Sequence, residues 1–265
     1  MHIHLILIHG AWQGSWVWQP SLPYFEQKGL FTYPVDLPGS GSPGNQIEDI
    51  GIENIQIDSY VKTISDVISR IEQGKSFNPR QDKVVLVAHS GGGVVATQVA
   101  ENYASRIDAV IYLAGMMLPP LVSFKNLLEQ LKQQGFDYSG IETCLKWNAD
   151  GSVSEVLTEA GAKIFLNDLP YNQAIKSAAK LTAQATSGLA IEANWSQEKF
   201  GQIPRLYVEC MLDRSVKPGI QKIMQRLVPG AKKVSLNTGH APHVSQPELT
   251  VNVISAFLFQ LFVEQ

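Results

Sequence analysis

Hydrophobic residues in this chain gather in short continuous runs rather than alternating with polar residues. The runs are rich in valine, isoleucine and leucine, and helix-length segments separate them. A strand covered on both faces produces such a run, as strands of parallel sheets do. We therefore predict a mainly parallel sheet of about six strands, at residues 3–8, 31–36, 83–88, 107–114, 205–210 and 232–236.

Between these runs the hydrophobic residues recur with the period of an amphipathic helix. The segments with this pattern are residues 16–28, 59–73, 92–104, 218–227 and 248–262. Strands that alternate with helices in this way are typical of α/β proteins. The predicted fold is a doubly wound α/β sheet, and 265 residues are enough for one core.

One long interval, residues 116–203, interrupts this alternation. It contains no convincing strand, only helical patterns over 125–134 and 174–185. Ligands of open α/β sheets bind beyond the carboxyl ends of the strands, where an insertion would roof the site. We therefore predict a core of residues 1–115 and 204–265, with residues 116–203 inserted as a helical cap.

Composition and charge exclude several classes of function. A net charge of −3 and 17% charged residues, without a basic stripe, disfavour a nucleic-acid partner. The apolar run at residues 5–8 is too short for a signal peptide or a membrane span, so we expect a cytoplasmic protein without a membrane partner.

Cys144 and Cys210 are far apart and belong to no Cys/His cluster, so we predict no disulfide, metal or organic cofactor. The oligomeric state, including a homodimer, stays open.

The most informative stretch is Ala88-His89-Ser90-Gly91-Gly92, which lies between a predicted strand and a predicted helix. A phosphate-binding loop would need a lysine after its last glycine, and valines follow here. The pattern small-x-Ser-x-Gly at a strand-to-helix turn instead predicts a nucleophile elbow, which exposes one serine hydroxyl. Ser90 is therefore the predicted nucleophile. A merely structural turn is the alternative.

A second glycine-rich stretch, residues 39–44, matches the dinucleotide-binding pattern G-x-G-x-x-G. Pro43 interrupts it, and no helical period follows to receive a pyrophosphate. A nucleotide site is therefore disfavoured.

A serine hydroxyl needs a general base and a group that orients this base. Of six histidines, only His240 and His243 follow the last predicted strand. His240 comes directly after Gly239 on a loop and is the favoured base, with His243 as the alternative. Asp213 lies just beyond a strand and is favoured as the acid over Glu209, which lies within that strand.

The oxyanion of acyl transfer needs two backbone N–H groups. Gly91 follows the nucleophile and supplies one. Ala11, in the loop after the first strand, is expected to supply the other because Gly10 lets the backbone turn. Trp12 and His89 are candidate substrate contacts, whereas His9 is expected to be structural.

The segments LILIHGAWQGSW, VDLPGSGSP, VVLVAHSGGG, YLAGMMLPP, YVECMLDRSV and TGHAPHVSQPEL together resemble the α/β-hydrolase superfamily. Within it they are most similar to small esterases, a branch that includes plant methyl esterases, plant hydroxynitrile lyases and EstC-like bacterial carboxylesterases. The resemblance covers nearly the whole chain outside the cap. It implies the triad Ser90, Asp213 and His240, in the order usual for the superfamily, with Ala11 and Gly91 as oxyanion amides.

Departures from the family pattern exclude or disfavour some of the reactions that members of the family catalyse. The lyases carry a threonine and a lysine where this chain has Gly10 and Ala241, so a lyase is disfavoured. Ser90 excludes relatives with an aspartate nucleophile. The sequence thus predicts a serine hydrolase that cleaves a small carboxylic ester through an acyl-enzyme. A hydroxynitrile lyase-like enzyme and a non-catalytic binding protein on the same scaffold are the alternatives.

Overall fold

The computed structural model describes residues 1–264 and contains the expected parallel sheet. Its six strands lie in the order β2-β1-β3-β4-β8-β9, and every neighbouring pair is parallel. The strands are β1 (Ile3–Ile8), β2 (Phe31–Val35), β3 (Lys83–His89), β4 (Ala109–Leu113), β8 (Arg205–Cys210) and β9 (Lys232–Leu236). The predicted fold class is confirmed.

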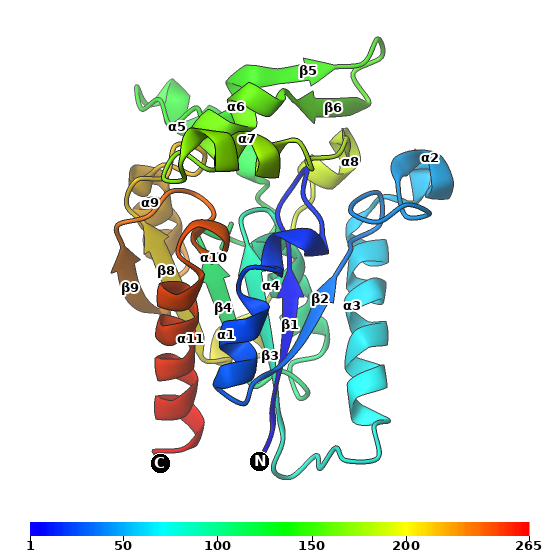
Figure 1. Cartoon of the computed structure of the whole chain (residues 1–265), viewed down its shortest axis with the longest axis vertical. Helices are drawn as coiled ribbons and strands as arrows, with labels where there is room; N and C mark the ends of the chain where they lie inside the picture. The colour runs from blue at the N-terminus through cyan, green and yellow to red at the C-terminus, as the bar shows by residue number, and fades with distance from the viewer. Residues whose placement is uncertain (265) are drawn as a thin grey trace.

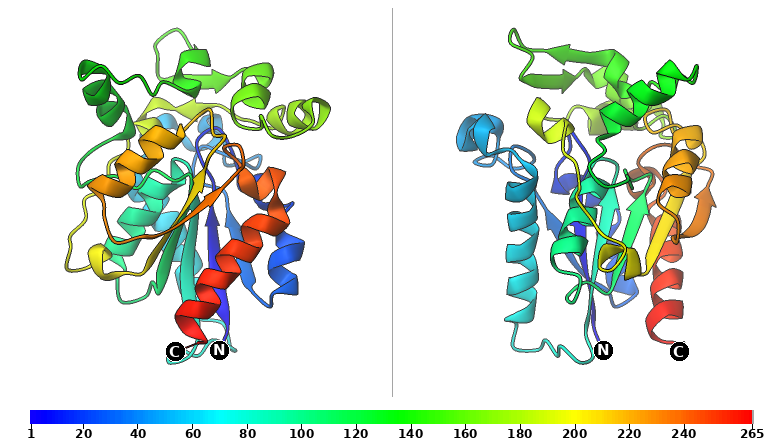
Figure 2. Two further views of the ribbon diagram at one scale, coloured as in Figure 1. Left: turned by 90° about the vertical axis from the view of Figure 1, so that its left-hand side faces the viewer. Right: turned by 180° about the vertical axis from the view of Figure 1, so that it is seen from behind.

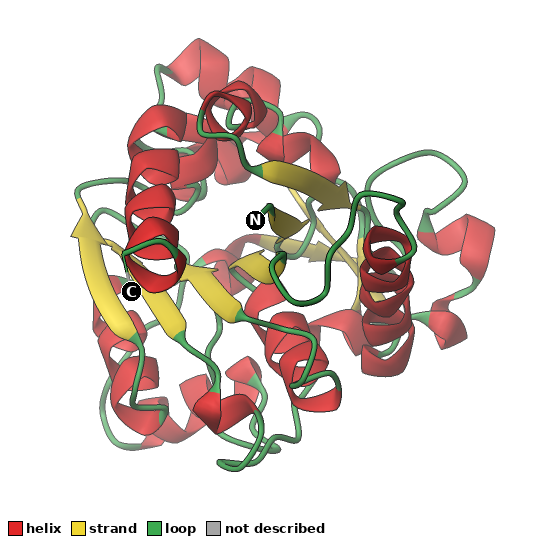
Figure 3. Ribbon diagram, turned by 90° about the horizontal axis from the view of Figure 1, so that it is seen from below, coloured by secondary structure: helices red, strands yellow, loops and turns green. Residues whose placement is uncertain are grey.

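The continuous apolar runs arise because helices cover both faces of the sheet (Figures 1, 2 and 3). The flanking helices are α1 (Leu22–Gln27), α3 (Ile57–Glu72), α4 (Gly92–Asn102), α9 (Pro218–Leu227) and α11 (Pro247–Phe262). Short helices α2 (Ile47–Ile50), η2 (Ile52–Asn54) and α10 (Pro242–Ser245) complete the loops. The predicted helix at 16–28 is divided into η1 (Ser15–Trp18) and α1, since Pro20 would break the interior of a helix, whereas Pro23 is tolerated in the first turn of α1.

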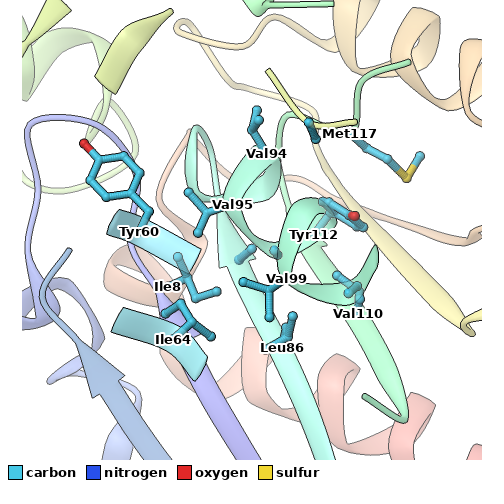
Figure 4. Close-up of a cluster of buried hydrophobic side chains, with 14 of the residues drawn as sticks. Ile8, Tyr60, Ile64, Leu86, Val94, Val95, Val99, Val110, Tyr112 and Met117 are labelled. Carbon is cyan, nitrogen blue, oxygen red and sulfur yellow. The ribbon is translucent and has the colours of Figure 1, made fainter. Parts of the chain in front are cut away.

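Each central strand contributes alternate residues to two separate hydrophobic clusters. In β1, Ile6 and Ile8 join the cluster with α3, α4 and α9, whereas Leu5 and Leu7 join the cluster with α1 and α11. Figure 4 shows the first cluster, where side chains from β1, α3, β3, α4 and β4 meet. Burial on both faces holds the strand ends, and hence the loops beyond them, in fixed positions.

A long segment separates β4 from β8, and its helices α5 to α8 lie over the carboxyl ends of the strands, whereas η4 lies next to the start of β8 (Figures 1 and 2). Its helices are α5 (Phe124–Gln133), η3 (Ile141–Cys144), α6 (Thr158–Ile164), α7 (Tyr171–Ala178), α8 (Thr186–Leu189) and η4 (Phe200–Gln202).

The inserted segment also holds strands, so the prediction that it has none was wrong. β5 (Leu145–Trp147), β6 (Val153–Val156) and β7 (Gln184–Ala185) form a small antiparallel sheet. These strands have three, four and two residues, too few to show a period in the sequence. The helix expected at 174–185 ends at Ala178.

Within residues 1–264, no helix is both long and apolar enough to cross a membrane. A cytoplasmic location stays a prediction.

Candidate active site

Ser90 occupies a strained turn between β3 and α4. Its φ is +51°, in the left-handed region that residues with a side chain rarely adopt. Its N–H donates to the Leu113 carbonyl, and its own carbonyl accepts from the N–H groups of Gly93 and Met116. The backbone geometry is that of the nucleophile elbow predicted from the sequence.

Close packing explains why glycines follow Ser90. A Cβ on Gly92 would lie 2.5 Å from the His9 carbonyl oxygen, and one on Gly93 would lie 2.7 Å from the Met116 amide nitrogen. Both neighbours are backbone atoms, which cannot rotate away. The glycines therefore let α4 approach the loops after β1 and β4, which is a packing requirement and not a phosphate site.

His240 and Asp213 form a buried pair. The Asp213 Oδ2 atom lies 2.7 Å from the His240 Nδ1 atom, and both side chains are almost fully shielded from solvent. A carboxylate at this distance favours the tautomer with the proton on Nδ1, which leaves the Nε2 lone pair free to accept a proton. The pair therefore has the chemistry of an oriented general base.

The Asp213 carboxylate is held by the loop that follows it. Its Oδ1 accepts the N–H groups of Ser215 and Val216, at 2.7 and 2.9 Å. Its Oδ2 also accepts from the Gln221 amide at 3.3 Å. These donors stabilise the ionised carboxylate and fix its direction. Glu209, the alternative acid, instead accepts from Gln225 and Ser235 on the flank of the sheet.

His89 connects the serine to the base. Its ring lies 4.5 Å from that of His240, and its Nε2 is 2.9 Å from the His240 carbonyl oxygen. Its Nδ1 is 2.9 Å from the Gln13 side-chain oxygen. Because His89 follows Ala88 on the strand and directly precedes Ser90, these contacts place the His240 loop beside the elbow.

The structure does not bring His89 to the cavity. Its side chain is completely buried, both ring nitrogens have partners, and it is not among the cavity-lining residues. Burial, together with the nearby His243 and His240 rings, lowers its pKa well below the usual range, so it stays neutral. The expectation of a substrate contact therefore does not fit, and His89 is better described as a positioning residue.

His243, the alternative base, lies behind the site. Its ring packs at 4.3 Å against Trp18 and 4.5 Å against His89, and neither nitrogen has a partner within residues 1–264. Burial, and to a lesser extent His240, lowers its pKa to about 3. Without a carboxylate to orient it, His243 lacks what a general base needs. His9 is structural as expected, since its ring bonds the Gly10 carbonyl and the Leu37 N–H.

The two residues expected to supply oxyanion amides line the same cavity as Ser90. Ala11 and Gly91 line the cavity beside it, and a Cβ on Gly91 would lie 3.7 Å from the Ala11 nitrogen. Neither amide has an acceptor among residues 1–264. A Cβ on Gly10 would lie 2.8 Å from that of Ser90, so only glycine brings the Ala11 loop this close. The two N–H groups are free to bind a developing oxyanion.

The cavity above Ser90 has a volume of about 410 Å³. Trp12, Val94, Met116, Leu128 and Ile191 give it apolar walls. The charged residues that line it, Lys125, Glu129, Lys132, Asp137 and Glu142, are all exposed and therefore form its mouth. Trp12 thus remains a candidate substrate contact, and its indole N–H donates to Ser154 of β6 at 3.1 Å.

The contacts between the inserted segment and the loops of Asp213 and His240 were not predicted from the sequence. Asp168, between α6 and α7, accepts the Gly239 N–H and the Ser245 hydroxyl, both at 2.7 Å. Asn167 donates to the Leu212 carbonyl at 3.1 Å, and Phe165 stacks on the His240 ring at 5.3 Å. The inserted segment therefore holds the loops of both Asp213 and His240.

Comparison with known proteins agrees with this geometry. The model of the alpha/beta hydrolase family matches residues 5–253. The chain belongs to the α/β hydrolase family. Methyl jasmonate esterase 1 of Vitis vinifera is 24% identical over 251 residues, 92% of each chain. The pyrethroid hydrolase of Sphingobium wenxiniae is 26% identical over 260 residues, 96% of this chain and 86% of the relative.

Among solved structures, polyneuridine aldehyde esterase superposes with a TM-score of 0.80 at 20% identity, and the superposition covers 97% of this chain and 100% of that one. This likeness confirms the fold. The superfamily resemblance expected from the sequence is confirmed as well, including its similarity to plant methyl esterases.

The crowding around the elbow makes a stability prediction. We expect Gly93→Ala to lower the free energy of unfolding by about 1–3 kcal/mol, because the new methyl group must push the Met116 backbone away. Urea unfolding followed by circular dichroism measures this. Gly91→Ala is the matched control in the same turn, since its methyl group meets nothing closer than 3.7 Å. Equal stability of the two variants would contradict the packing explanation.

Proposed function

We propose that this protein is a serine hydrolase that cleaves small carboxylic esters through an acyl-enzyme intermediate. The observation that carries the proposal is the buried Asp213–His240 pair, whose loop His89 holds beside the strained turn of Ser90, where neighbouring backbone amides are free. The esterase and hydrolase names of the relatives support the same reaction class.

In the first half-reaction, the Ser90 Oγ attacks the ester carbonyl carbon while His240 Nε2 takes the hydroxyl proton. The tetrahedral oxyanion accepts hydrogen bonds from the Ala11 and Gly91 N–H groups. Asp213 stabilises the imidazolium and does not take the proton itself. When the carbon–oxygen bond to the alcohol breaks, His240 gives its proton to the leaving alkoxide, and the acyl group stays on Ser90.

In the second half-reaction, His240 removes a proton from water, and the resulting hydroxide attacks the acyl carbon. The same two amides hold the second oxyanion. The bond to Ser90 Oγ then breaks, the serine regains its proton from His240, and the carboxylic acid leaves. No redox step and no external reductant or oxidant enters this sequence.

The proposed substrates are esters with an apolar acyl or alcohol group. A volume of about 410 Å³ falls in the range of small-molecule sites, and the walls near Ser90 are hydrophobic. We propose that residues 116–203 act as the cap, on a core of residues 1–115 and 204–265, because α5 and α8 supply much of this lining. Gly10 and Ala241 offer no side-chain hydroxyl or amine beside the triad, which disfavours the lyase alternative.

Removing the nucleophile or the base tests the mechanism. We expect Ser90→Ala and His240→Ala each to lower kcat for p-nitrophenyl esters by about 10⁴-fold or more, since the triad acts as a unit. His243→Phe keeps an aromatic ring against Trp18 and should retain most of the turnover. Ester hydrolysis by Ser90→Ala, or a larger loss in His243→Phe than in His240→Ala, would show that the roles are assigned wrongly.

The shape of the cavity predicts how chain length affects turnover. Leu128→Trp on α5 places a larger side chain in the wall, so we expect it to shift the preferred p-nitrophenyl ester toward shorter acyl chains. The profile of kcat/KM from acetate to decanoate measures the shift. Gln133→Trp, at an exposed position of the same helix, should leave the profile unchanged. An unchanged profile in Leu128→Trp would mean that the acyl chain lies elsewhere.

Asp168 is proposed to position His240 through the backbone of Gly239. Asp168→Ala removes the acceptor, and we expect kcat to fall about 10–100-fold with little change in KM, since small displacements of a base are costly. Asp168→Asn retains a side-chain oxygen and should recover most of the loss. An equal loss in both variants, or an effect on KM alone, would argue against positioning.

A further inference from the structure

Two histidines and an aspartate that the proposed reaction does not use lie at the opposite end of the sheet. His2 and His4 are two residues apart at the start of β1, so their side chains leave the strand on the same side. Asp82 directly precedes β3, which pairs with β1 in the register Ile3 to Lys83. The cluster is at the amino ends of these strands, whereas Ser90 follows the carboxyl end of β3 (Figure 1).

The three side chains bring potential metal-ligand atoms together. One ring nitrogen from each histidine and one Asp82 oxygen lie within 4.8 Å of one another, and within residues 1–264 no other group of three such residues does so. His2 Nδ1 is 3.3 Å from Asp82 Oδ1. Two imidazoles and a carboxylate are a donor set that suits Zn²⁺ and related first-row divalent ions.

His4 carries the decisive observation. It is 7% exposed, and its Nε2 has no hydrogen-bond partner within residues 1–264. Its Nδ1 is 2.9 Å from the Tyr33 hydroxyl. When Nδ1–H donates to that oxygen, Nε2 carries a lone pair, as in histidines that bind metals with an outer partner on the second nitrogen.

Two backbone N–H groups hold the Asp82 side chain in place. Its Oδ1 accepts the backbone N–H of His2 at 2.6 Å, and its Oδ2 accepts the backbone N–H of Asn78 at 2.8 Å. An ion pair between His2 and Asp82 would explain these two residues. It would leave the buried His4 nitrogen without a partner, which native proteins generally avoid.

We propose that His2, His4 and Asp82 bind one Zn²⁺ ion, with water in the remaining coordination position. Zinc–ligand distances of about 2.0–2.2 Å require the donors to approach one another. His2 precedes the first residue of β1 and nearly half of its side chain is exposed, so its ring can turn toward His4. The bound ion would tie the start of β1 to the loop before β3 and thereby stabilise the sheet, without a part in ester cleavage.

No metal was expected from the sequence, because Cys144 and Cys210 belong to no Cys/His cluster. The overlooked signal is the His-x-His pattern on a strand, which places two imidazoles on one face. Asp82 could not be added from the sequence, since only the pairing of β1 with β3 brings it to them.

Zinc titration of the full-length protein, freed of metal with EDTA, tests the proposal. We expect calorimetry to show one Zn²⁺ per chain, and a hundredfold excess over Kd to raise Tm by about 5–10 °C.

His2→Ala alters a half-exposed side chain and should weaken binding at least about tenfold. His4→Phe keeps an aromatic ring to stack on Phe31, now 5.3 Å from His4, and should abolish the tight site. Asp66→Asn, an exposed carboxylate on α3, is the control and should bind like wild type.

Three outcomes would overturn the proposal. The first is the absence of stoichiometric zinc binding to the folded wild-type protein. The second is binding that His2→Ala and His4→Phe, shown by circular dichroism to be folded, leave unchanged. The third is binding that persists in His2→Ala but is lost in His240→Ala, which would place the ion at the catalytic pair.

Discussion

Ser90 is forced into a left-handed backbone conformation by the way β3, α4 and the loops around them pack together. Its N–H donates to the Leu113 carbonyl at the end of β4, and its carbonyl accepts from the Met116 N–H at the start of the inserted segment. Gly92 and Gly93 have no Cβ, so neighbouring backbone can pack directly against them. The sheet can impose this strain because its central strands are buried on both faces. Without this crowding, the hydroxyl would have no fixed place relative to Ala11, Gly91 and His240.

The proposed acid and base depend on a second constraint, which is that hydrogen bonds hold their two loops in fixed positions. Asp213 is fixed within its own loop by the Ser215 and Val216 amides, so its direction is set locally. His240 is fixed from outside: His89 holds its carbonyl, and Asp168 of the inserted segment holds the preceding amide. The segment that lines the cavity therefore also holds the loop of His240, and in the proposed mechanism this links the shape of the substrate site to the position of the base.

Much of the fold could be predicted because burial on both faces leaves a clear pattern. The runs that became β1, β3 and β8 are continuous, and the serine-glycine pattern marks the strand-to-helix turn. Asp213 and His240 could be proposed because each follows a predicted strand. The small sheet β5-β6-β7 could not, since its strands are too short for a period to appear. His89 was misjudged because its neighbour Ser90 faces the cavity, whereas its own ring points into the protein. Asp168 and Asn167 were missed because their partners are backbone atoms far along the chain.

The central claim is that Ser90 is a nucleophile activated by His240, and covalent labelling with a fluorophosphonate tests it most directly. The account predicts one adduct per chain, located by peptide mass spectrometry on Ser90, absent in Ser90→Ala and formed far more slowly in His240→Ala. An adduct on another residue, or a folded wild-type protein that forms none, would contradict the account.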